Sequence, residues 1–289
     1  MILLFGSTGY IGSEFKKQLT ARGIDAFFWK DSFSLTFQKI DSWFNESGKP
    51  DITAAINASG YTGSPNVDAC DLNKEETIKS NVIIPQIISD WCYSKNITLC
   101  QISTGCIYLG KNIDGSAFSE QDVPNFSFKD GGHIYSGSKI LSEKIISNLK
   151  KHYIWRLKTP FEEYDHPKNL ITKLLKYQKT LMFESSISNK QECVNACIES
   201  LIQQIPFGIY NVTNTGHITS EYLINKIKST IAKDKIFEMM SEEDFYRSFK
   251  CLKRANCILD NSKIRSHGIK IKNVNESIDH CLINWKYNE

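Results

Sequence analysis

The chain has 289 residues, of which 41% are hydrophobic and 23% charged, and its formal net charge at pH 7 is +3. This composition is ordinary for a globular protein with one large domain or two modest ones. The small charge, with Lys and Arg scattered along the chain, argues against a nucleic-acid partner, and no apolar run approaches the roughly 18 residues that predict a membrane span.

The first 160 residues alternate between strand and helix patterns. Short apolar segments bounded by turn signals predict strands at 2–6, 24–29, 52–59, 97–104 and 153–160. Helical patterns lie between them, at 11–22, 35–46, 74–95 and 135–150. Apolar strands that alternate with helices predict an α/β fold of the Rossmann type, a doubly wound parallel sheet covered on both faces.

The pattern loses its regularity after Pro160. Helices are predicted at about 168–178 and 190–203, a late sheet strand at 208–213, and mostly helical structure over 217–289. We therefore expect a dinucleotide-binding Rossmann domain over 1–160, completed by the late strand. A smaller, mostly helical and partly interleaved lobe would follow over 161–289. The ligand is expected between them, because open parallel sheets bind at the carboxyl ends of their strands.

The seven residues "GSTGYIG" join the first strand to the first helix. Their GxxGxxG pattern is a variant of the dinucleotide fingerprint, in which glycines allow a tight turn and a close approach of backbone amides to a pyrophosphate. The residues predicted to bind the cofactor here are Gly6, Ser7, Thr8, Gly9, Tyr10, Ile11 and Gly12.

Two further strand ends are expected to complete the cofactor site. Lys30 and Asp31 follow the second strand, where a basic residue accommodates the 2′-phosphate of NADP and an acidic one binds the 2′-hydroxyl of NAD. Because Lys30 comes first, we favour NADPH and keep NADH as the alternative. Asn57, Ala58 and Ser59 end the third strand, and such small residues allow adenine and ribose to lie near the backbone.

The segment "YSGSK" places Tyr135 and Lys139 four residues apart, on one face of a predicted helix. In a carbonyl reductase a phenol supplies the proton when hydride reaches the carbonyl carbon, and a nearby ammonium lowers the phenol pKa from about 10. Thr104, at the end of the fourth strand, is expected to hydrogen-bond the carbonyl. The motifs together resemble the extended short-chain dehydrogenase/reductase superfamily, and this resemblance implies that Lys139 also holds the nicotinamide ribose.

The segment "STGCIY" separates this chain from simple reductases. Reductases of the dTDP-4-dehydrorhamnose type carry Ser-Thr-Asp there, whereas this chain has Gly105 followed by Cys106. Together with "NASGYTGSPNVDACD", "PNF", "NLITK", "GIYNVTN" and "RANCILDNSKI", it resembles the bifunctional UDP-4-keto-6-deoxyglucose 3,5-epimerase/4-reductases of UDP-rhamnose synthesis. A ketone at C4 acidifies the hydrogens on C3 and C5, so one site can epimerise and then reduce.

The resemblance implies further roles in the predicted site. Cys106 would be the epimerisation base, activated near Lys139 and the nicotinamide, and Lys173 would be the partner acid, with Lys168 and His166 as competitors. Arg254 would contact the diphosphate and Asn169 the sugar or diphosphate. Glu162, Glu163 and Lys168 depart from the family pattern, so UDP is implied only by overall likeness.

Nine cysteines are present, and the N-terminus lacks the basic region of a signal peptide. We therefore expect reduced thiols and a cytoplasmic location. Cys70, Cys92 and Cys100 are expected in the core, and no metal site is predicted from the cysteine spacings.

The predicted reaction takes UDP-4-keto-6-deoxy-D-glucose and NADPH to UDP-L-rhamnose. The chain shows no 4,6-dehydratase half, so an upstream dehydratase is expected as a separate protein. The alternatives are a 4-keto reductase without epimerase activity and a non-catalytic NADP-binding regulatory subunit. A homodimer is kept open, because the sequence does not decide the oligomeric state.

Overall fold

The computed structural model describes residues 1–30, 33–129, 132–249 and 251–287. Its centre is a six-stranded sheet in the order β10-β5-β4-β3-β1-β2, and all neighbouring strands are parallel. The α/β prediction and the six predicted strands are confirmed. The strands are β1 (Ile2–Phe5), β2 (Ala26–Trp29), β3 (Ala54–Asn57), β4 (Thr98–Thr104), β5 (His152–Leu157) and β10 (Gly208–Asn211).

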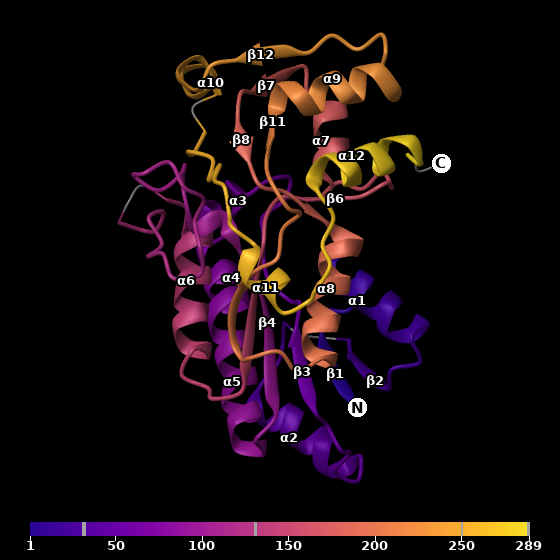
Figure 1. The fold of residues 1–289 in the computed structure, drawn as a ribbon. Coiled ribbons are helices and arrows are strands. Elements are labelled where there is room, and N and C mark those ends of the chain that lie inside the picture. Colours follow the sequence, from indigo (N-terminus) through magenta and orange to yellow (C-terminus); the bar gives the residue numbers. More distant parts are fainter. Residues whose placement is uncertain (31–32, 130–131, 250, 288–289) are drawn as a thin grey trace.

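Helices cover both faces of this sheet, as Figure 1 shows. On one face, α1 (Tyr10–Ala21), α8 (Lys190–Ile202) and α11 (Ser262–Ser266) pack on side chains such as Leu4 and Ile56. On the other, α2 (Phe37–Glu46), α5 (Ile84–Lys95) and α6 (Ile134–Ile146) pack on Leu3 and Phe5. Successive residues of β1 thus enter opposite cores, which explains why the buried strands are apolar throughout rather than alternating.

The predicted helix at 74–95 contains a turn of π-helix. It consists of α4 (Lys74–Ile78), the π-helical turn η1 (Lys79–Ile83) and α5, and the short helix α3 (Ala69–Leu72) precedes it. The wider turn directs the Asn81 side chain inward. Its Nδ2 donates to the carbonyl of Tyr61, and its Oδ1 accepts from the backbone amide of Tyr61. Asn81 also donates to the Ser138 hydroxyl, so η1 is tied to α6.

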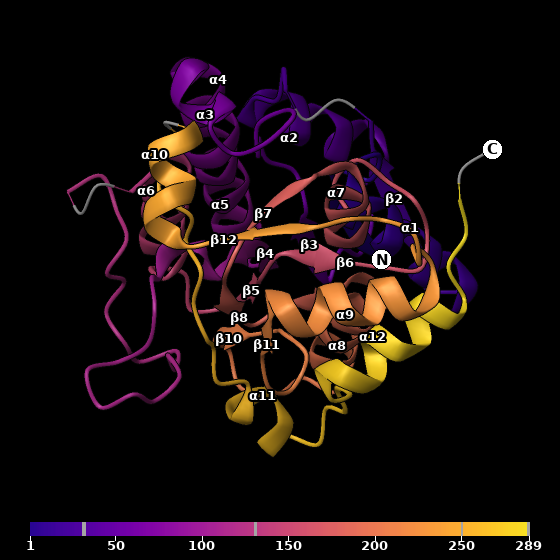
Figure 2. The ribbon, with the colours of Figure 1, turned by 90° about the horizontal axis from the view of Figure 1, so that it is seen from above.

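The C-terminal lobe lies at the carboxyl ends of the strands (Figures 1 and 2). Helices α7 (Leu170–Lys176), α9 (Ser220–Thr230) and α12 (Val274–Ile283) share a separate apolar core that includes Phe161 and Ile278. Helix α10 (Glu242–Phe249) and three two-stranded ladders complete the lobe. The ladders pair β6 (Pro160–Phe161) with β9 (Ser188–Asn189), β7 (Lys179–Leu181) with β12 (Glu238–Met240), and β8 (Glu184–Ser185) with β11 (Ile218–Thr219).

The sequence patterns did not indicate these short ladders. The chain runs from the lobe back to the sheet through α8 and β10 before it returns to the lobe at β11. The domain boundary at residue 160 stays a prediction. Across the described ranges, no helix combines the length and apolar character needed to cross a bilayer.

Candidate active site

A cavity of about 1190 Å³ opens between the sheet and the C-terminal lobe. It is lined by the loops after β1, β3, β4 and β5 and by parts of α6, α7 and α10. Several residues predicted from the sequence share this cavity: Gly9, Tyr10, Ile11, Ala58, Ser59, Thr104, Cys106, Tyr135, Lys139, Lys173 and Arg254.

The glycine loop folds as a tight turn that leaves the start of α1 open. A Cβ on Gly12 would lie 1.9 Å from the Gly6 carbonyl oxygen, and Gly6 itself has φ +77° and lies against the backbone of Ser59. The N-cap residue of α1, Gly9, provides no side-chain cap, so the first amides of the helix are available to a phosphate. Ser7 is buried and Thr8 is exposed, and neither lines the cavity.

The β2 end lies next to the glycine loop. The register pairs Phe5 with Trp29, so Lys30 follows at the same sheet edge as Gly6. Lys30 is exposed, whereas Asp31 lies outside the described residues. The preference for NADPH over NADH stays a prediction.

Asn57 supports the predicted cofactor site from below. Its fully buried amide donates to Gln101 Oε1 at 2.9 Å, and its oxygen accepts from the Ser59 backbone amide at 3.0 Å. Ala58 and Ser59 line the cavity, but Asn57 does not. Asn57 thus fixes the loop after β3 through its hydrogen bonds.

Tyr135 and Thr104 are hydrogen-bonded at the cavity wall. Burial and the nearby Cys106 raise the pKa of Tyr135, and the hydrogen bond with Thr104 opposes this only in part. The expectation that the Lys139 ammonium lowers this pKa is wrong, because burial raises the pKa of Tyr135 more than the Thr104 hydrogen bond lowers it. The phenol stays protonated, which is the form a proton donor needs.

Lys139 is nearly fully buried, with 5% of its surface exposed. Its Nζ donates to the carbonyl of Ile102 at 3.3 Å and lies so near the loop after β3 that a Cβ on Gly60 would be 3.3 Å away. Burial lowers the pKa of Lys139 to about 8, against the attraction of Glu143. Lys139 and Tyr135 both line the cavity, and the role of Lys139 in holding a ribose stays a prediction.

Cys106 lies in a 3-10 turn, η2 (Gly105–Ile107), and is partly exposed to the cavity. Its backbone amide donates to Thr104 Oγ1 at 3.0 Å. The ammonium that reaches its sulfur belongs to Lys158, whose Nζ lies 3.4 Å from Sγ, and not to Lys139 as expected. The sequence reasoning missed Lys158, which directly follows β5; the β4–β5 register, in which Thr104 pairs with Leu157, brings it next to Cys106.

Lys173 lies on α7, half-buried and facing the cavity. Burial lowers its pKa, and the positive charges of Lys168 and Arg254 lower it further, while Cys106 opposes them. The two competitors are placed differently. Lys168 also lines the cavity, but it is exposed and donates to Thr62 Oγ1. His166 does not line it and stacks on Tyr10, with ring centroids 4.4 Å apart.

Asn169 caps α7 and does not line the cavity. Its oxygen accepts from the Ile171 amide at 3.0 Å, and its nitrogen donates to the carbonyls of Glu162 and Tyr164. Both polar atoms of the Asn169 side chain are thus hydrogen-bonded to the backbone. Asn169 therefore has a structural role here rather than the expected contact with the substrate.

Arg254 faces the cavity, but its guanidinium makes a bidentate pair with Asp68, with N–O distances of 2.6 and 2.8 Å. A diphosphate would have to compete with that carboxylate for the same guanidinium N–H donors.

Glu162 is one of the two acidic residues that depart from the family pattern. It is buried, and its carboxylate pairs with Lys190 at 2.5 Å.

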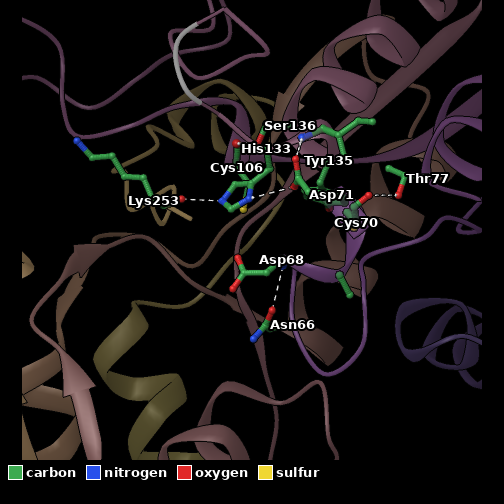
Figure 3. A network of polar contacts seen from close by, with 12 residues as sticks. Asn66, Asp68, Cys70, Asp71, Thr77, Cys106, His133, Tyr135, Ser136 and Lys253 are labelled. Carbon is green, nitrogen blue, oxygen red and sulfur yellow. Dashed lines mark hydrogen bonds and ion pairs between the residues drawn. The ribbon is translucent and has the colours of Figure 1, made fainter. Parts of the chain in front are cut away.

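A polar network that sequence reasoning missed ties the start of α6 to the C-terminal lobe (Figure 3). The buried ring of His133 lies 2.6 Å through Nε2 from the carbonyl of Lys253 and 3.6 Å through Nδ1 from the Asp71 carboxylate. Ser136 donates to the carbonyl of Cys106 at 2.6 Å. The network fixes the loop of Cys106 against the helix that carries Tyr135.

The fold and the Thr-Tyr-Lys arrangement define a Rossmann-type oxidoreductase of the extended short-chain dehydrogenase/reductase class. Within the described part of the chain, no group of three or more His, Cys, Asp or Glu is arranged to hold a metal ion. More narrowly, the chain matches the RmlD substrate binding domain over residues 1–286 and belongs to that family.

Individual relatives resemble the chain over nearly its whole length. It is 30% identical over 284 residues to the bifunctional dTDP-4-dehydrorhamnose 3,5-epimerase/dTDP-4-dehydrorhamnose reductase of Arabidopsis thaliana, covering 96% of this chain and 90% of the relative. It is 28% identical to the trifunctional UDP-glucose 4,6-dehydratase/UDP-4-keto-6-deoxy-D-glucose 3,5-epimerase/UDP-4-keto-L-rhamnose-reductase RHM1 of the same plant, but spans only 40% of that protein. The solved L780 UDP-rhamnose synthase of Acanthamoeba polyphaga mimivirus superposes with a TM-score of 0.86 over 98% of both chains, at 22% identity.

Proposed function

We propose that the protein is a bifunctional 3,5-epimerase/4-keto reductase that converts UDP-4-keto-6-deoxy-D-glucose to UDP-L-rhamnose with NADPH. The observation that carries this proposal is one cavity that presents four groups together. Thr104 and Tyr135 can bind a carbonyl oxygen, and Cys106 and Lys173 can exchange protons beside it.

The glycine loop fits a dinucleotide. Gly6, Gly9 and Gly12 form a cradle that a Cβ would fill, Ala58 and Ser59 line its continuation, and the cavity extends from there to Tyr135 and Lys139. Lys139 would hold the nicotinamide ribose and Lys30 the 2′-phosphate. When bound, the dinucleotide supplies the hydride for reduction at C4.

For the reductive step, the substrate carbonyl accepts hydrogen bonds from Thr104 and Tyr135. These bonds strengthen as negative charge develops on the oxygen, which is the source of rate acceleration. Tyr135 then gives its phenolic proton to the O4 alkoxide. Its raised pKa keeps that proton in place until the alkoxide, a much stronger base than phenolate, has formed.

For the epimerisation, the Cys106 thiolate removes a proton from C3 or C5, and the C4 oxygen takes up the negative charge as an enolate held by Thr104 and Tyr135. Lys173 in its ammonium form returns a proton to the opposite face of the same carbon, which inverts the configuration. The lowered pKa of Lys173 makes this transfer easier, because its burial among cations favours the neutral amine.

The relatives' names agree on sugar chemistry and differ on the nucleotide. One is a dTDP-linked epimerase/reductase, and the trifunctional one acts on UDP sugars. We favour UDP because the solved neighbour L780 is a UDP-rhamnose synthase and the trifunctional relative acts on UDP sugars. The chain spans 40% of the length of the trifunctional relative, and we propose that a 4,6-dehydratase activity provides the 4-keto substrate. Cytoplasmic location and a homodimer stay predictions.

The test is incubation with UDP-4-keto-6-deoxyglucose in deuterated water, with and without NADPH, using wild type and Cys106→Ala. NMR follows deuterium at C3 and C5 and the configuration of the product. Exchange in wild type that is lost in Cys106→Ala, with reduction retained, supports both activities. Consumption of NADPH without exchange would leave a 4-keto reductase, and cofactor binding without turnover would favour the regulatory subunit.

A further inference from the structure

Lys158 is a buried lysine whose ammonium faces thiols. Only 3% of its surface is exposed. Its Nζ donates to the carbonyl of Ala255 at 2.5 Å and to Cys106 Sγ at 3.4 Å. Burial alone would lower the pKa of Lys158, but the attraction of Cys106 and Cys257 and the hydrogen bond to Cys106 raise it. The ammonium therefore keeps its proton inside the protein because sulfur lies beside it.

The backbone is arranged to permit this contact. Thr104 pairs with Leu157 in the β4–β5 register, so Lys158 leaves its strand next to the turn that carries Cys106. A Cβ on Gly105 would lie 2.5 Å from Leu259 Cδ1 and 3.3 Å from Lys158 Cδ. The glycine between Thr104 and Cys106 thus leaves room for the lysine stem.

We propose that Lys158 is a positioning residue that holds the Cys106 sulfur as a thiolate directed at the cavity. A buried charge needs a partner, and the thiolate is the partner that this geometry offers. The use of the thiolate as the epimerisation base rests on the proposed function, whereas the charge pair does not. The remaining titratable groups that face Cys106 are Tyr135, Lys173 and Cys257.

The two lysines near Cys106 are expected to play different parts. Lys158 is held by Ala255 and by the thiol and keeps its proton, whereas burial and neighbouring cations lower the pKa of Lys173. Lys158 stabilises the base before and after each proton transfer. The proton removed from the sugar goes to sulfur, and the one returned comes from Lys173.

The pH dependence of thiol alkylation tests the pair without any sugar. Cys106 and Cys251 are partly exposed, and the other seven cysteines are buried, so the experiment uses a Cys251→Ser background. The iodoacetamide rate is measured against pH, with mass spectrometry to locate the label. The midpoint of the rate against pH is compared between the Cys251→Ser protein and its Lys158 variants. Lys158→Met should raise this alkylation midpoint by about one to three pH units. Lys158→Arg keeps the positive charge, so its midpoint should stay close to that of the Cys251→Ser protein.

Lys176→Met is the matched control, since it removes an exposed cavity lysine and should leave the midpoint in place. An unchanged midpoint in folded Lys158→Met would overturn the proposal. Lys158→Gln also removes the charge and carries the same expectation as Lys158→Met, so the test does not depend on one variant folding.

Deuterium exchange separates this proposal from the proposed function. If Lys158→Met shifts the alkylation midpoint but the Cys251→Ser protein shows no exchange at C3 or C5, the Lys158–Cys106 pair is supported and the epimerase activity is refuted. If the Cys251→Ser protein shows exchange but Lys158→Met leaves the alkylation midpoint unchanged, the epimerase activity is supported and the Lys158–Cys106 pair is refuted. If both hold, the pH profile of exchange moves with the alkylation midpoint.

Discussion

Lys139 is expected to destabilise the fold below pH 8, and replacing it by methionine should reveal by how much. Burial lowers its pKa from 10.5 to about 8. At about 1.4 kcal/mol per pH unit, this difference corresponds to about 3 kcal/mol of lost stability when the lysine is protonated in both the folded and unfolded states. The buried side chain makes this an interior effect that solvent screens little, since only 5% of it is exposed.

The sign of the pH dependence follows from the lowered pKa. Below pH 8 both states carry the proton, and the folded state bears the whole penalty of burying it. Between about pH 8 and 10.5 the unfolded chain binds more protons than the folded one, so stability contributed by this group rises with pH. Above 10.5 both states are neutral and the penalty is gone.

Urea unfolding of wild type and Lys139→Met at pH 7 and pH 10 measures this effect. The variant should be more stable than wild type at pH 7, and that advantage should shrink by about 2 kcal/mol at pH 10. Other groups that titrate in this range cancel in the difference between the two proteins. An advantage that stays the same at both pH values would refute the assignment of a lowered pKa to Lys139.

Three further predictions concern other parts of the site. Gly12→Ala should abolish NADPH binding in a fluorescence titration, because its Cβ would lie 1.9 Å from the Gly6 carbonyl oxygen, and retained affinity would contradict that geometry. Asn169→Ala should lower the free energy of unfolding by about 1 kcal/mol through the lost α7 cap, with UDP affinity unchanged in calorimetry. Asp68→Asn should tighten UDP binding and Arg254→Ala should weaken it, and equal effects of both would refute competition for the guanidinium.

The strands and most helices could be predicted from sequence because their signals are local. Buried parallel strands appear as apolar runs, and the glycine loop must join a strand to a helix in chain order. The two-stranded ladders of the C-terminal lobe could not be predicted, because segments such as Glu184–Ser185 are too short to show a strand period. Their pairing partners also lie far along the chain. The π turn around Asn81 likewise leaves the helical pattern intact while it changes which side chain points inward.

Sequence reasoning named Lys139 and Lys173 as site residues but missed Lys158, and it could not predict the protonation of any of the three. Lys139, Lys158 and Lys173 all meet the cavity, yet burial lowers the pKa of the first and third and thiols raise that of the second. The difference lies in the neighbours, and Lys158 meets Cys106 and Ala255 from 52 and 97 residues away. A reductase needs only a carbonyl-binding pair and a ribose-binding lysine. The epimerase activity that we propose would need two more lysines, Lys158 to keep its proton beside the Cys106 sulfur and Lys173 to give a proton up. The charge states of these side chains therefore bear on the proposed function more directly than their presence in a motif.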